Sequence, residues 1–296
     1  MTLLDRALVS VLPAVPKPVV QLFSARYIAG STLADAVRVV RRLNAEGKLA
    51  TIDVLGEEIT REEEARAIAQ AYRDVFAAIE REGLASNVSV KLTGLGLKLA
   101  YDLCRENLES ILAQGQFVRI DMEDTSTTDE TLRLYRELRE DGHENVGIVL
   151  QAYLRRTLDD IYAIADLRPN VRLCKGIYVE PPALAFTDYE AVRANYVKAL
   201  RALSVVDGAH VAIATHDEWL IGEALRLLPP SYEFQMLLGV REERATQLVH
   251  EGHRLRVYVP FGEQWYRYSL RRLQENPAMA GTIARSTVGR LLGRGG

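Results

Sequence analysis

The chain has few of the residues that mark extracellular, metal-binding or membrane-spanning proteins. Only two of its 296 residues are cysteines, Cys104 and Cys174, which excludes a disulfide framework and gives no zinc-ligand spacing. His250 and His253 lie three residues apart without a third ligand type nearby, so no metal site is predicted. No apolar run approaches the roughly 18 residues of a spanning helix. A reducing compartment is therefore expected, and the cytoplasm is the predicted location.

Neither sign of charge is in excess. Lysine and arginine total 37 against 40 acidic residues, a net charge of −3, so no nucleic-acid partner is expected. Residues 1–11 include Asp5 and no basic region, which argues against a secretory signal. Hydrophobic residues make up 48% of the chain, enough for a large core. This length suits one barrel with extensions better than two domains.

The chain does contain eight apolar runs that alternate with stretches of helical spacing. The runs are Leu49–Val54, Val88–Leu92, Phe117–Met122, Val146–Leu150, Val171–Leu173, His210–Ala214, Tyr232–Leu237 and Leu255–Val259. Parallel strands need crossovers of about a dozen residues or more, and the intervening stretches are long enough. The pattern predicts an α/β fold, a (β/α)8 TIM-like barrel, over residues 48–276. Residues 1–47 are predicted as an N-terminal helical arm and residues 277–296 as a tail.

End signals place helices between these runs. Ser31 and Thr32 open a helix that runs through Ala45, and Gly47 just beyond its end stops it. Thr60 followed by Glu63 predicts a capping box for the next helix. Further helices are expected over Arg61–Glu82, Leu103–Ala113, Thr128–Asp141, Leu158–Asp166, Asp188–Leu203, Glu218–Leu228, Glu242–Glu251 and Glu263–Leu273.

Polar residues stand at or just past the carboxyl ends of the apolar runs. They are Asp53, Lys91, Asp121, Gln151, Lys175, Thr215 with His216, Gln235 and Tyr258. Barrel enzymes carry their active sites at this end, so the side chains should converge and the protein should be an enzyme. Two other functions stay open at this point. One is a cofactor-free lyase or aldolase that forms a Schiff base at Lys91 or Lys175. The other is a barrel that binds a small anion without catalysis.

Two features point to anionic ligands. Arg172 lies within a strand, and an inward arginine needs an anionic or polar partner because an unpaired buried charge is costly. Gly176 would let a ligand approach the backbone closely. The segment 215–217 opens a helix whose N–H groups suit a phosphate, although His216 could also be a simple helix cap.

The last predicted helix carries a polar stripe. Tyr268, Arg271, Arg272 and Glu275 recur at helical spacing and share one face. Two adjacent guanidiniums suit a carboxylate or a phosphate, whereas the alternative is an ordinary solvated basic face.

Taken in order, these motifs resemble the proline dehydrogenase family in its short, monofunctional bacterial form. The matching segments are Val90–Thr93, Ile120–Glu123, Leu150–Arg156, Arg172–Tyr178, Thr215–His216, Glu233–Leu237 and Tyr268–Asn276. The resemblance implies a distorted barrel that holds FAD, with the last helix over the barrel mouth. It also implies oxidation of L-proline to Δ1-pyrroline-5-carboxylate by hydride transfer to FAD. Electrons would pass to a membrane quinone, which brings the protein to the inner face of the cell membrane, and the product would pass to a pyrroline-5-carboxylate dehydrogenase.

The resemblance also implies roles for particular residues. Asp121 and Arg172 match catalytic positions, with Asp121 either taking a proton or only orienting neighbours. The implied substrate-binding residues are Lys91, Arg271, Arg272, Tyr258, Tyr268, Leu237 and Glu275. The implied FAD-binding residues are Met122, Gln151, Arg172, Lys175, Gly176, Ile177, Thr215 and His216. Ile177 departs from the small residue that the family usually has there, so loop packing or access at the mouth is expected to differ.

Overall fold

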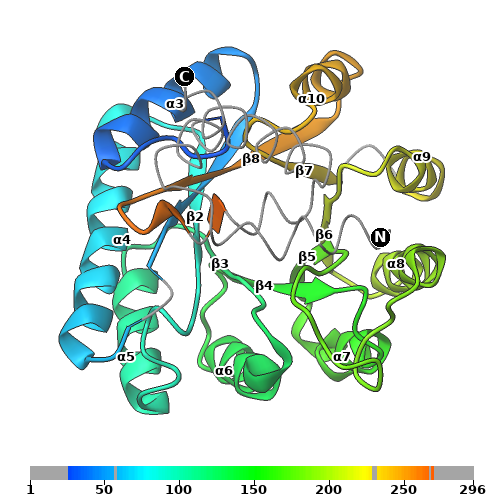
Figure 1. Ribbon diagram of the computed structural model, residues 1–296, viewed down its shortest axis with the longest axis horizontal. Coiled ribbons are helices and arrows are strands. Elements are labelled where there is room, and N and C mark those ends of the chain that lie inside the picture. Colours follow the sequence, from blue (N-terminus) through cyan, green and yellow to red (C-terminus); the bar gives the residue numbers. More distant parts are fainter. Residues whose placement is uncertain (1–25, 57–58, 229–231, 267, 270–296) are drawn as a thin grey trace, which may run out of the picture.

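The computed structural model describes residues 26–56, 59–228, 232–266, 268 and 269. Eight parallel strands form a closed barrel in which each strand pairs with the next along the chain and β8 pairs with β1 (Figure 1). The strands are β1 Leu49–Val54, β2 Ser86–Val90, β3 Val118–Ile120, β4 Val146–Gln151, β5 Asn170–Cys174, β6 His210–Ala214, β7 Glu233–Leu237 and β8 Arg254–Phe261. The predicted (β/α)8 barrel is confirmed.

A ring of helices surrounds the barrel (Figure 1). The helices are α3 Leu33–Ala45, α4 Glu62–Glu82, α5 Tyr101–Leu112, α6 Thr128–Glu140, α7 Thr157–Ala163, α8 Tyr189–Ser204, α9 Glu218–Leu227 and α10 Glu242–His250, with 3-10 turns at Thr125–Thr127 and Ala165–Leu167. Within the residues that the structure describes, none of these helices combines the length and apolar character needed to cross a membrane.

Helix α3 covers the seam between β8 and β1 and so completes the ring beside α4 (Figure 1). Of the two residues predicted to open it, Ser31 and Thr32, the second is the N-cap and forms a reciprocal capping box with Asp35. Its apolar face, which includes Val40 and Leu43, is buried against the barrel. The segment before β1 thus occupies a position that in a regular barrel belongs to the helix after β8.

Two local predictions were wrong. Helix α4 has Arg61, not Thr60, as its N-cap, and its capping carboxylate is Glu64 rather than Glu63. Glu64 accepts from the backbone N–H groups of Arg61 and Thr60 at 3.1 and 2.8 Å. Because Glu62, Glu63 and Glu64 are adjacent, the sequence alone does not show which of them closes the capping box. In the folded backbone it is Glu64. The helix predicted over Leu158–Asp166 ends earlier, at Ala163. A separate 3-10 turn over Ala165–Leu167 follows it.

The strands alternate more regularly than their nearly continuous apolar composition suggests. Ile52, Val90, Ile120 and Leu173 are buried in the hydrophobic core with the helices. Their neighbours in sequence instead contact one another across the barrel interior: Asp53, Lys91, Asp121 and Arg172. TIM barrels usually fill this interior with branched apolar side chains. Here much of it is a charged, hydrogen-bonded network that reaches the carboxyl ends of the strands.

Candidate active site

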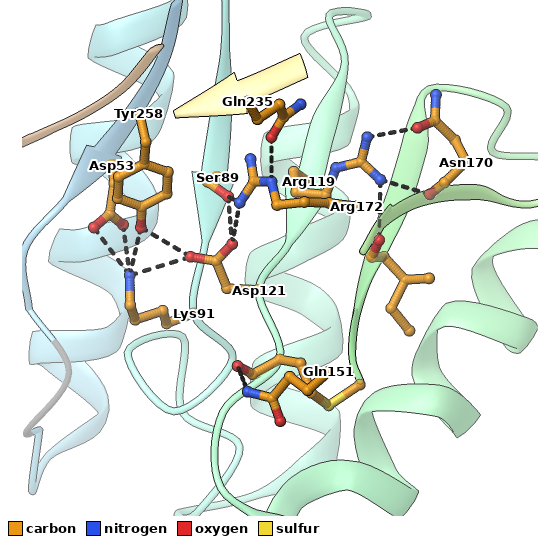
Figure 2. A network of polar contacts seen from close by, with 12 residues as sticks. Asp53, Ser89, Lys91, Arg119, Asp121, Gln151, Asn170, Arg172, Gln235 and Tyr258 are labelled. Carbon is orange, nitrogen blue, oxygen red and sulfur yellow. Dashed lines mark hydrogen bonds and ion pairs between the residues drawn. The ribbon is translucent and has the colours of Figure 1, made fainter. Parts of the chain in front are cut away.

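Lys91 is the junction of this network, just past the end of β2. Its Nζ lies 3.0 and 2.9 Å from the two carboxylate oxygens of Asp53, 3.3 Å from Asp121 Oδ2 and 3.0 Å from the hydroxyl oxygen of Tyr258 (Figure 2). An ammonium has three N–H donors, so Asp53, Asp121 and Tyr258 can take all of them. The Asp53 side chain is fully buried and only 11% of the Lys91 side chain is exposed. Lys91 is therefore held as a charged group between two carboxylates.

Asp121, just past the end of β3, is the central acceptor. Its Oδ1 accepts from the Ser89 hydroxyl at 2.6 Å and from Arg172 Nη1 at 2.8 Å. Its Oδ2 accepts from Tyr258 at 2.9 Å and from Lys91 at 3.3 Å. Burial by itself raises the pKa of Asp121, but the charges of Lys91 and Arg172 and the two hydroxyl hydrogen bonds outweigh it, so the pKa lies below its usual value. An ionised carboxylate with four donors orients its neighbours well and is a weak proton acceptor.

Tyr258, on β8, connects Lys91 to Asp121 because its hydroxyl accepts from the first and donates to the second. Burial, followed by the negative charges of Asp121 and Asp53, raises the pKa of Tyr258 well above its ordinary value. The group therefore stays a neutral phenol. The guanidinium of Arg172 lies over its ring, 5.4 Å from the centroid, which adds a cation–π contact.

Arg172, on β5, faces the barrel interior and has the anionic partner that the sequence demanded. Its Nη1 donates to Asp121 and, at 3.0 Å, to the Ser89 hydroxyl, while its Nε donates to Gln235 Oε1 at 2.5 Å. Only 8% of its side chain is exposed. Strands β2, β3, β5 and β7 thus meet at one guanidinium (Figure 2).

Asp53, which was expected to converge with the other strand-end residues, and Ser89, which was not, both belong to this cluster. Tyr72 of α4 is fully buried and donates to the Ser89 carbonyl oxygen at 2.7 Å, with its hydroxyl 3.2 Å from Asp53 Oδ1. The signal that could have identified Ser89 is the period of two, which places it on the same face of its strand as Lys91.

The residues predicted to line the cofactor lie on or just after four consecutive strands, β3 to β6. Met122, Gln151, Arg172 and Thr215 are buried, and Lys175, Gly176, Ile177 and His216 are half-buried. Gln151 Nε2 donates to the Met122 carbonyl oxygen at 3.1 Å. Its buried Oε1 has no hydrogen-bond partner among the described residues. Because an unsatisfied buried acceptor is costly, this oxygen is suited to an N–H or O–H donor of a ligand.

Gly176 has a second reason for being glycine besides close approach of a ligand. Its φ is +105°, and a Cβ added there would lie 2.0 Å from Cδ1 of the Tyr153 ring. The Tyr153 N–H also donates to the Lys175 carbonyl oxygen at 2.7 Å. The loop after β5 is therefore packed directly on the loop after β4, and this packing permits no side chain at position 176.

The start of α9 differs from its prediction. Asp217, not His216, is the helix cap, and its carboxylate accepts from the Trp219 N–H at 3.1 Å. His216 instead accepts from the Leu237 N–H through Nε2, which ties the ends of β6 and β7 together. Asp217 also pairs with Arg193 at 2.8 Å and lies 3.5 Å from Lys175 Nζ. A phosphate at this helix end would therefore share it with the carboxylate of Asp217 and its partners Arg193 and Lys175.

Some of the remaining residues predicted to bind substrate lie within the described part of the chain. Tyr268 is buried in a small cluster with Tyr27, Ile28 and Leu55, against which Tyr258 packs. Leu237, at the end of β7, is half-buried. Trp265, Tyr266, Tyr268 and Ser269 are helical. The predicted residues Arg271, Arg272 and Glu275 lie outside the described residues.

Comparison with known proteins identifies the family of this chain. The family described as Proline dehydrogenase matches residues 36–285. Proline dehydrogenase 1 of Bacillus subtilis (strain 168) is 41% identical over 278 residues, which cover 90% of this chain and 91% of that protein. Proline dehydrogenase of Deinococcus radiodurans is 36% identical over 277 residues, which cover 89% of each chain.

A solved structure shares the fold. Proline utilization A (PutA) from Bdellovibrio bacteriovorus, inactivated by N-propargylglycine, superposes with a TM-score of 0.78 at 26% identity. The match covers 86% of this chain and 32% of PutA, so this chain spans about a third of that protein. On the family match and on the identity to full-length relatives, the chain belongs to the proline dehydrogenase family.

Proposed function

We propose that the protein oxidises L-proline to Δ1-pyrroline-5-carboxylate, the first step of proline catabolism, with FAD as the hydride acceptor. Family membership supports this activity. The observation that carries it is the convergence of Lys91, Asp121, Arg172 and Tyr258, from four strands, at one end of the barrel. A membrane quinone would accept the electrons at the inner surface of the cell membrane, and a pyrroline-5-carboxylate dehydrogenase would take the product.

The residues after β3 to β6 fit a flavin nucleotide. The buried Oε1 of Gln151 offers an acceptor to an N–H group, and the half-buried Lys175 offers a cation to a phosphate. Met122, Gly176, Ile177, Thr215 and His216 would form the rest of the binding surface. When bound, FAD would take the hydride from the ring carbon beside the proline nitrogen.

Lys91, Arg271 and Arg272 would bind the proline carboxylate, with Tyr258, Tyr268, Leu237 and Glu275 around the ring. Lys91 already directs its N–H groups at three partners, and its contact with Asp121, at 3.3 Å, is the longest of them. Exchange of this contact would give the substrate one donor without breaking the pair with Asp53. Fixing the ring in this way supplies rate because it removes the entropy of encounter.

Asp121 would orient Arg172 and Tyr258 rather than remove the amine proton. Its lowered pKa and its four donors make it a weak base, and Tyr258 remains a phenol. Arg172 would stabilise negative charge that develops during hydride transfer. The Schiff-base alternative is disfavoured at Lys91, because an ammonium between two carboxylates is not the neutral amine that such chemistry needs.

Anaerobic mixing with L-proline tests the proposal. The purified protein should be yellow, and its flavin absorbance should bleach when proline is added. A colourless protein that borohydride traps with a carbonyl substrate would identify a lyase or aldolase instead. Melting that depends on a small anion, without any turnover, would identify a binding protein.

Separate substitutions Arg271→Met and Arg272→Met should each raise the KM for proline at least about tenfold while bound flavin is retained. Loss of one buried charged hydrogen bond costs about 2–5 kcal/mol, which sets this lower limit. Steady-state kinetics together with the flavin-to-protein absorbance ratio measure both quantities. An unchanged KM in both variants would refute the carboxylate site.

A further inference from the structure

A chain of hydrogen bonds leads from Arg172 toward the opposite end of the barrel. Gln235 accepts from Arg172 Nε at 2.5 Å and donates through Nε2 to Glu233 Oε1 at 2.7 Å. Glu233 in turn accepts from Arg256 Nε at 2.8 Å and Nη2 at 3.1 Å. We propose that Gln235 is a positioning residue for Arg172, and that Glu233 sets the orientation of the Gln235 amide. This inference rests on the proposed function, because it assigns Arg172 its place beside the reacting centre.

The two ends of Gln235 allow only one orientation of its amide. Arg172 can only donate and an ionised carboxylate can only accept, so the amide oxygen must face Arg172 and the amide nitrogen must face Glu233. Burial raises the pKa of Glu233, but Arg256 and the hydrogen bond from Gln235 outweigh it and keep the carboxyl ionised. Glu233 and Gln235 are 3% and 6% exposed, which leaves little room for water to replace either contact.

Gln235 controls which edge of the Arg172 guanidinium faces Asp121. A guanidinium is planar, so fixing Nε fixes the direction of its two terminal nitrogens. With Nε on Gln235, Nη1 reaches both Asp121 and Ser89 (Figure 2). Without that acceptor, only the hydrogen bonds to Asp121 and Ser89 and the contact with the Tyr258 ring would limit rotation of the guanidinium.

Arg119, on β3, provides a matched control within the same interior. Its Nη2 donates to the amide oxygen of Asn170, and its Nη1 donates to the backbone carbonyl oxygens of Ile148 and Asn170 (Figure 2). Asn170→Leu removes an amide acceptor from a buried arginine, as Gln235→Met does. The backbone carbonyls would still hold Arg119, and neither residue contacts Asp121.

The experiment compares Gln235→Met, Glu233→Gln and Asn170→Leu by anaerobic stopped-flow reduction with L-proline, each also in an Arg172→Met background. Gln235→Met should slow reduction about 10- to 100-fold, the value of one hydrogen bond to a charged group. Glu233→Gln should slow it in the same direction, and it serves if Gln235→Met does not fold. Neither should slow it further once Arg172 is methionine, and Asn170→Leu should leave the rate near that of the unmodified protein.

An NMR measurement tests the position of Arg172 without relying on the reaction rate. The Arg172 Nε–H resonance, assigned by its absence in Arg172→Lys, should shift and exchange faster with water in Gln235→Met but not in Asn170→Leu. An unchanged resonance, or an equal loss of rate in both Arg172 backgrounds, would overturn the inference. If proline fails to reduce the flavin at all, the proposed function fails, while the NMR comparison still decides whether Gln235 positions Arg172.

Discussion

Replacing Asp121 by asparagine is expected to slow reduction of the flavin by proline about a hundredfold or more. Asp121 is the acceptor shared by Lys91, Arg172, Ser89 and Tyr258. An asparagine offers one acceptor oxygen and turns its NH₂ group toward other donors. Removal of one partner from a buried ion pair typically costs about 3–5 kcal/mol, because the remaining charge is left uncompensated. The arginine and the tyrosine would both lose their orientation at once.

The same variant should change how stability depends on pH. The pKa of Asp121 is lower in the folded protein than its usual value, so its ionised form stabilises the fold above about pH 4 and this contribution is lost as the pH falls further. Asp121→Asn should therefore be less stable than the unmodified protein near neutral pH, and the difference should narrow in acid. Denaturant unfolding between pH 7 and 3 measures it.

Ser89→Ala is the control for this prediction. It removes the 2.6 Å hydrogen bond to Asp121 and the 3.0 Å hydrogen bond from Arg172 but keeps both ion pairs of Asp121, so it should cost about 1–3 kcal/mol, less than Asp121→Asn. A normal reduction rate in Asp121→Asn would exclude an organising role for the carboxylate. Slow reduction whose dependence on pH is also lost in Asp121→Asn would instead point to Asp121 as the proton acceptor.

The barrel and the main site residues could be predicted because both follow from short-range rules. Eight apolar runs separated by helical stretches permit few folds, and the carboxyl ends of parallel strands meet at one rim. Lys91, Asp121 and Arg172 were therefore recognisable from position alone. The inward direction of Arg172, with Leu173 on the opposite face, follows from the period of a strand, and the structure confirms it.

The pairings within the cluster could not be predicted. Asp53 and Gln235 were among the polar residues expected to converge and Ser89 was not, but which side chains meet depends on strand tilt and side-chain length rather than on sequence spacing. A local cue can also suit two positions equally. Glu63 and Glu64 could both close the α4 box, and His216 and Asp217 could both cap α9. Only the backbone path selects Glu64 and Asp217.

Replacing Arg172 by methionine should slow flavin reduction about 100- to 1000-fold while proline binding changes little. A preorganised donor at a centre of developing negative charge is worth about this much, since it acts in a site from which water is excluded. Arg172 donates to Asp121, Ser89 and Gln235, none of which is predicted to bind proline, and it contacts the Tyr258 ring, which is predicted to lie beside the substrate ring rather than its carboxylate. Its loss should therefore lower the limiting rate more than the affinity. Anaerobic stopped-flow over a range of proline concentrations separates the two.

Arg119→Met is the matched control, because Arg119 is also a buried arginine of the barrel interior but contacts Asn170, backbone carbonyls and the Phe117 ring instead of Asp121. Both variants should lower the free energy of unfolding. Only Arg172→Met should slow reduction, so equal effects of the two variants on the limiting rate would mean that Arg172 acts through the stability of the barrel. A normal limiting rate in Arg172→Met would remove it from the mechanism, and the ion pair with Asp121 would then serve only to neutralise a buried carboxylate.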